Sequence, residues 1–87
     1  MKVVLNITLQ GVSADHTLEF EGEPRDEDVK RVAVELVRSG NLPGLHVAGL
    51  PEDAFDAYMV DRFNTTEGGR RFFLRPKVPF GAAASRR

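Results

Sequence analysis

Apolar and polar residues alternate from the first residues of the chain, and this period of two is typical of a half-buried β-strand. The same alternation returns over residues 16–21, after a turn expected within 11–15. Two such runs close together in the sequence predict an N-terminal β-hairpin over residues 2–21, with acidic residues on the outer face of its second strand. The apolar positions of the first strand are Val3, Leu5, Ile7 and Leu9.

After the hairpin, the spacing of apolar residues changes to intervals of three and four, as on one face of a helix. The residues with this spacing are Val29, Val32, Ala33, Leu36 and Val37. Pro24 suits a first helical position, and the acids at 26–28 favour the positive end of a helix dipole. Gly40 suits the end of the helix. We therefore expect a helix over 24–39, with Val34 off the apolar stripe, either at the margin of the core or in contact with a partner.

The middle of the chain is less regular. Residues 41–51 are expected to form an irregular connection, and its apolar residues cap the core: Leu42, Leu45, Val47 and Leu50. Residues 51–63 fit either a helix or an aromatic and β-branched strand over 55–63, ahead of a turn at 64–69. We favour the strand, because the β-prone run 70–75 needs a sheet to join and a two-stranded hairpin is only marginally stable alone.

This order of elements predicts an α+β fold. It is β-grasp-like, with an N-terminal β-hairpin, one crossing α-helix and a mixed sheet of about four strands. By this layout the chain resembles the ubiquitin-like superfamily, and most of all its small bacterial members, through the hairpin 2–21, the helix 24–39 and the last strand 70–75. The resemblance implies a protein-interaction module or, in some systems, a conjugated modifier. We expect a single domain over 1–80 and a flexible tail over 81–87.

The C-terminus departs from that of a conjugated modifier, which ends in a glycine pair on a flexible tail. This chain ends in Ser-Arg-Arg, and its glycine pair, Gly68-Gly69, precedes the last strand and is expected to form a turn. Removal of residues 82–87 would leave Gly81 at the C-terminus. Gly81 is therefore a possible processing site.

The formal net charge of −1 hides an uneven distribution. Residues 1–61 carry twelve acids and five bases, a net charge of −7, whereas residues 62–87 carry one acid and seven bases, a net charge of +6. Such a polarity can steer a charged partner, or it can reflect internal pairing of the last strand with acidic neighbours. We favour internal pairing.

Candidate catalytic chemistry is sparse. The chain has no Cys, which excludes thiol chemistry and disulfides, and its two His residues lie apart with no partner at a metal-ligand spacing. We expect no enzyme activity, no metal and no cofactor. The chain begins with an alternating strand pattern instead of an apolar leader, and no apolar run is long enough to span a membrane. The expected location is cytoplasmic.

Binding has more support, because basic and aromatic residues interleave at the end of the chain. If residues 70–75 form a strand, Phe72 and Leu74 point into the core, and Phe73 lies on the outer face between cations. An exposed aromatic among arginines can stack on bases or grip an acidic peptide. Alternatively, Phe73 packs under the tail or Tyr58 and the arginines pair with Asp56 or Asp61. The partner-binding candidates are Arg70, Arg71, Phe73, Arg75, Lys77 and Phe80.

These features lead to two hypotheses. The first is a module that binds a partner protein, such as a conjugating or processing enzyme, through its sheet and its basic C-terminal strand. The alternative is a small nucleic-acid-binding domain that uses the basic C-terminal third. The net charge of −7 on the rest of the chain would repel a polyanion and argues against the alternative.

Overall fold

In the computed structural model, which describes residues 1–77, the first two strands form the expected hairpin. β1 (Lys2–Leu9) pairs antiparallel with β2 (Val12–Glu19), and Leu9 lies opposite Val12. The turn is therefore only two residues long, shorter than the expected 11–15. Gln10 and Gly11 both have positive φ, 52° and 80°, as the tight turn that best fits the twist of paired strands requires.

The helix of the described residues, α1 (Asp26–Ser39), begins two residues later than predicted. Pro24 precedes the helix and is not its first residue. Arg25 caps the helix with an extended backbone, and its N–H donates to a carboxylate oxygen of Asp28 at 3.1 Å. At the other end, Gly40 has φ 81°, which is the left-handed conformation expected of a residue that terminates a helix.

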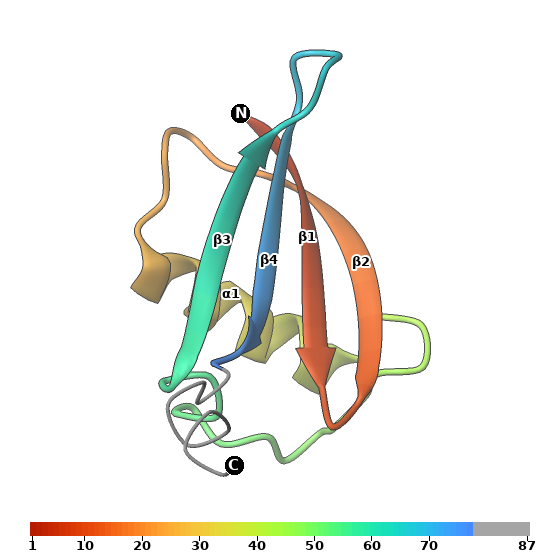
Figure 1. Cartoon of the computed structure of the whole chain (residues 1–87). Coiled ribbons are helices and arrows are strands. Elements are labelled where there is room, and N and C mark those ends of the chain that lie inside the picture. Colours follow the sequence, from red (N-terminus) through yellow and green to blue (C-terminus); the bar gives the residue numbers. More distant parts are fainter. Residues whose placement is uncertain (78–87) are drawn as a thin grey trace, which may run out of the picture.

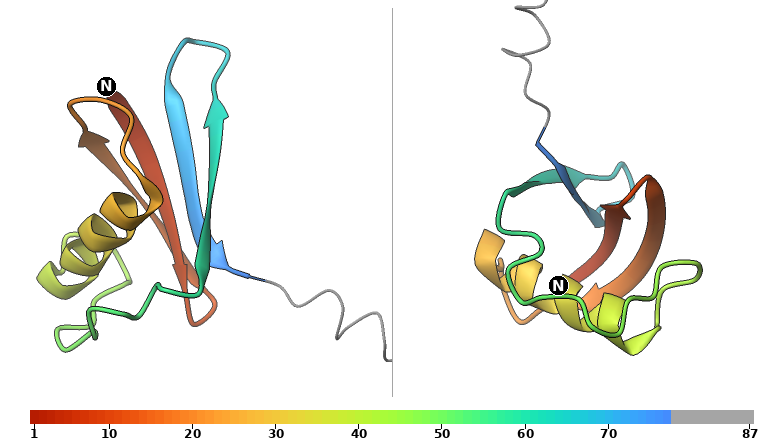
Figure 2. Two further views of the ribbon diagram at one scale, coloured as in Figure 1. Left: turned by 90° about the vertical axis from the view of Figure 1, so that its left-hand side faces the viewer. Right: turned by 90° about the horizontal axis from the view of Figure 1, so that it is seen from below.

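The four strands form one mixed sheet in the order β2-β1-β4-β3. β4 (Arg70–Pro76) pairs parallel with β1 at the centre, and β3 (Tyr58–Asn64) pairs antiparallel with β4 at the edge. Figure 1 shows α1 crossing behind this sheet, and Figure 2 shows that the helix and the connection after it lie on the same side. The α+β, β-grasp-like fold class is thereby confirmed.

The ambiguous segment divides into two parts. Residues 52–57 form successive turns, held by backbone bonds such as Ala54 N–H to Pro51 O at 3.1 Å and Tyr58 N–H to Phe55 O at 2.9 Å. The strand begins only at Tyr58, three residues later than expected. The turns place Phe55 in the core, where its ring meets that of Tyr58 edge-on at 4.8 Å.

One continuous cluster of buried apolar side chains lies between the sheet and the helix layer. Three of the four expected capping residues of the 41–51 connection, Leu42, Leu45 and Leu50, are buried, but Val47 is 37% exposed. Val34, expected either at the margin of the core or in contact with a partner, is instead buried within the chain. The apolar face of α1 is thus wider than its spacing suggests, and Val34 lines one pocket with Glu52 and Asp56 of the segment that follows the connection.

Candidate functional site

The strand alternation of β4 divides its residues between the two faces of the sheet. Phe72 and Leu74 point toward the helix and are fully buried, whereas Phe73 is half-buried on the opposite face. Arg71 and Arg75 share the face of Phe73, because they lie two residues before and after it. We call this side, which no helix or connection within residues 1–77 covers, the open face (Figure 2).

Phe73 is the centre of an aromatic and cationic cluster on the open face. Its ring meets that of Phe63 edge-on, with centroids 5.6 Å apart and planes at 79°. The guanidinium groups of Arg71 and Arg75 lie 5.4 Å and 5.3 Å from the Phe73 centroid. Tyr58 lies on the other face of the sheet, so it does not cover Phe73 as one interpretation proposed.

Two apolar side chains of β3 extend this cluster to the edge of the sheet. Phe63 is 50% exposed and Met59 is 39% exposed, and they lie opposite Arg71 and Arg75 of β4. These are two of the four large hydrophobic residues that are exposed among residues 1–77. Sequence reasoning placed both in a strand but did not include either in the site. The alternation of Met59, Asp61 and Phe63 was the available signal.

The two arginines of the open face are already engaged in ion pairs. Arg71 binds Asp15 of β2 at 3.0 Å, and Arg75 binds Asp61 of β3 at 2.8 Å. The face therefore carries matched charges and is not a free basic patch. Pairing of Arg75 with Asp61 agrees with the interpretation that the charge polarity of the sequence reflects internal complementarity.

Arg70 points to the helix side of the sheet, away from Arg71 and Arg75. Together with Arg62 it binds Glu23, at 2.7 Å and 2.6 Å, and both guanidinium groups lie over the buried ring of Phe72. Hydrogen bonds from Arg70 and then from Arg62 lower the pKa of Glu23 from its ordinary value of 4.5. Arg70 is thus part of a structural network that ties the segment before α1 to the sheet.

The remaining candidates lie at the end of the chain. Lys77 is exposed just beyond β4. Phe80 and the possible processing site Gly81 lie outside the described residues, as does the tail expected over 81–87. The structure therefore brings together Arg71, Phe73 and Arg75 of the predicted set, separates Arg70 from them, and adds Phe63 and Met59.

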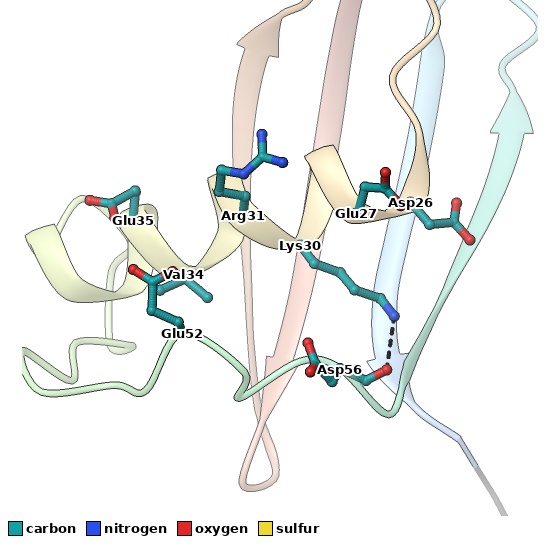
Figure 3. Close-up of a pocket in the computed structure, with 8 residues that line it drawn as sticks. All are labelled: Asp26, Glu27, Lys30, Arg31, Val34, Glu35, Glu52 and Asp56. Atoms are coloured by element: carbon teal, nitrogen blue, oxygen red, sulfur yellow. Dashed lines mark hydrogen bonds between the residues drawn. The ribbon is translucent and has the colours of Figure 1, made fainter.

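A pocket of about 310 Å³ lies between α1 and the turns that follow the connection (Figure 3). The Lys30 ammonium crosses it and donates to the carbonyl oxygen of Asp56 at 3.1 Å. The charged side chains around it include five acids and two bases, so its potential is negative. Its lining residues are Asp26, Glu27, Lys30, Arg31, Val34, Glu35, Glu52 and Asp56.

The histidines have separate surroundings. His16 is half-buried in β2, and the Nε2 atom of His46 lies 3.1 Å from the carbonyl oxygen of Arg38, near the end of α1. In the part of the chain that the structure describes, no three His, Cys, Asp or Glu residues are grouped so that they could hold a metal ion. The same part contains no helix long and apolar enough to cross a membrane.

Comparisons of this chain with protein-family models, with curated proteins and with solved structures give no match. The structure itself gives the class of the molecule: it is an α+β domain of β-grasp-like layout with an aromatic cluster on the open face of its sheet.

Proposed function

We propose that the protein is a non-enzymatic, ubiquitin-like interaction module or modifier, and that it binds a partner protein through the open face and the basic C-terminal strand. The observation that carries this proposal is the exposed ring of Phe63 beside Phe73 on the open face, which no other part of residues 1–77 covers. Aromatic residues and arginine are enriched at protein interfaces, and they dominate the binding energy there. The strand order with a parallel central pair supports the ubiquitin-like layout.

The ion pairs of the basic C-terminal third favour a protein partner over a nucleic acid. Four of the seven bases in the C-terminal third bind carboxylates of the same chain. A phosphate backbone would have to displace those carboxylates, whereas a protein surface can bury the aromatic rings and leave the pairs intact. The four paired bases are Arg62, Arg70, Arg71 and Arg75.

The proposal is tested by capturing partners from the native cell with the tagged wild-type chain and with a Phe73→Ala variant. Partners that bind the open face should be lost with Phe73→Ala, and the same loss should follow from Arg71→Glu. The matched control is Val47→Ala, which removes an exposed apolar side chain from the connection on the helix side. A captured partner should then bind the purified wild-type chain with a defined stoichiometry in calorimetry.

A partner that binds all three variants equally would show that the open face is not the interface. The alternative function, nucleic-acid binding, would be favoured if the chain binds a labelled oligonucleotide at low salt and if the logarithm of the affinity falls linearly with the logarithm of the salt concentration. The role as a modifier has a separate test. Intact-mass measurement of the protein from native cells should detect a species that ends at Gly81 if the C-terminus is processed.

A further inference from the structure

β3 is the outermost strand of the sheet, and its outer side carries backbone groups that form no hydrogen bond within residues 1–77. In an antiparallel pair, the residues that lie opposite each other alternate between hydrogen-bonded and non-hydrogen-bonded pairs. Just beyond the strand, the Thr65 N–H donates to Gly69 O at 2.9 Å, so that pair is hydrogen-bonded. At the other end, Tyr58 lies opposite Pro76, which has no N–H to donate. Counted from either end, the same pairs are hydrogen-bonded: those of Met59, Asp61 and Phe63 with their partners on β4.

It follows that Met59, Asp61 and Phe63 use their backbone groups to bind β4. The backbone groups of Val60, Arg62 and Asn64 point the other way, to the outer edge of the sheet. Among residues 1–77, no strand pairs with this edge and no turn or side chain bonds to these three backbones. No Pro, Gly or bulge interrupts Tyr58–Asn64, so the edge lacks those common barriers to strand addition.

We propose that the β3 edge receives an extended segment of the partner protein as a fifth, antiparallel strand; this rests on the proposed function and specifies its geometry. An added strand would place alternate side chains on the open face beside Met59, Asp61 and Phe63. Two apolar residues would cover Met59 and Phe63, both of which are exposed. The residue between them would lie opposite Asp61.

The charge of Asp61 selects the residue opposite it. Arg75 contacts one carboxylate oxygen, Oδ2: its Nε–H donates to Oδ2 at 3.0 Å, and its Nη2 lies 2.8 Å from the same oxygen. The other oxygen, Oδ1, accepts no hydrogen bond from the described residues. A Lys or Arg on the added strand can bind Oδ1 and complete a row of alternating charges. The segment that fits therefore reads apolar, any, basic, any, apolar.

A second copy of this chain fits the same edge less well. The antiparallel register that pairs Met59 with Phe63 of the other copy places Asp61 opposite Asp61. Like charges directly opposite each other on neighbouring strands are destabilising. The charge of Asp61 therefore favours a strand of a partner protein over a second copy of this chain.

The experiment titrates the isotope-labelled full chain with an acetylated and amidated peptide, Thr-Val-Thr-Arg-Thr-Val-Thr, and follows the backbone amides by NMR. Strand addition predicts an alternating response. The amides of Val60, Arg62 and Asn64 should gain protection from hydrogen exchange and shift most, and those of Met59 and Phe63 should change little. A peptide with Glu in place of Arg should bind at least about twofold more weakly.

The variant Asp61→Asn should remove this preference for Arg over Glu. The matched control Asp15→Asn, which lies on the β2 part of the open face, should keep it. A response without alternation, or no response at millimolar peptide, would overturn strand addition. The same alternation without peptide, in a chain that sediments as a dimer, would show that the occupant is a second copy.

Failure of strand addition leaves the proposed function separately testable. Peptide-induced shifts at Phe73 and Arg71 without changes along the β3 edge would overturn the added strand and still support binding at the open face. Conversely, capture of a partner that is insensitive to Phe73→Ala and Arg71→Glu would count against the open face, whatever the peptide does.

Discussion

Phe72 and Phe73 are adjacent on β4 but lie on opposite faces of the sheet. Replacing each by Ala in turn tests whether Phe73 is less deeply buried than Phe72, as its position on the open face requires. Phe72 is fully buried among the sheet and helix side chains, with its ring 6.4 Å from that of Phe20. Substitution of a buried Phe by Ala typically costs about 3–5 kcal/mol. Since a domain of 87 residues has a total stability of roughly 4–13 kcal/mol, Phe72→Ala should remove a large part of it.

Phe73→Ala should cost less. The ring is half-buried, so the lost burial is about half of the roughly 1.5–3 kcal/mol for a fully buried side chain. The edge-on contact with Phe63 adds about 0.5–1.5 kcal/mol. The expected loss in the free energy of unfolding is therefore about 2 kcal/mol, below that of Phe72→Ala.

Urea denaturation followed by far-ultraviolet circular dichroism measures this difference. With a slope of about 2 kcal/mol per molar urea, the unfolding midpoint should fall by about 1 M for Phe73→Ala and by about 2 M for Phe72→Ala. The denaturant slopes of both variants should match that of the wild type. Equal midpoint shifts for the two variants would mean that Phe73 is as deeply buried as Phe72, and the argument for an interface there would fail.

Two further predictions concern the ends of α1. Because Arg70 and Arg62 lower the pKa of Glu23, the carboxylate form stabilises the folded state above the ordinary value of 4.5, and this stability is lost as the pH falls through the lowered pKa. Glu23→Gln should thus reduce the drop in melting temperature between about pH 5 and pH 3, and an unchanged drop would contradict the role of the network. Gly40→Ala should lower the free energy of unfolding by about 1–2 kcal/mol, because Ala is strained at the positive φ of 81°. The new Cβ itself has room, since the nearest atoms, in His46, lie 3.5 Å away. Gly49→Ala, at a site with open space and no positive φ, is the control and should be nearly neutral in chemical denaturation.

The elements that the sequence predicted best are those whose pattern is set locally. The period of two in residues 2–9 and the three- and four-residue spacing in α1 depend only on which face of each element is apolar. The helix start was displaced because Pro24 is also compatible with the extended backbone that precedes a cap. Residues 52–57 were not predicted as turns, because their aromatic and acidic residues satisfy several local patterns and only burial of Phe55 selects one.

The candidate site shows the same division. Strand alternation predicted that Phe73 and its flanking arginines share a face opposite Phe72. It could not predict that Arg71 meets Asp15, which lies 56 residues away in sequence, because that contact needs β1 between β2 and β4. Nor could it add Phe63 to the cluster, since the register between β3 and β4 places that ring beside Phe73.

The sequence by itself determined which side chains each element presents to the core and to the outside, because the periods of strands and helices are properties of the local backbone. It also determined that the charges are unevenly distributed along the chain. Only the tertiary structure decided that the basic residues near the C-terminus form ion pairs with acidic residues earlier in the same chain. The parallel pairing of β1 with β4 places the basic last strand next to the acidic hairpin and beside β3, and contacts between residues so distant in sequence depend on strand order and register. For the same reason, only the assembled sheet shows that β3 is its outer edge.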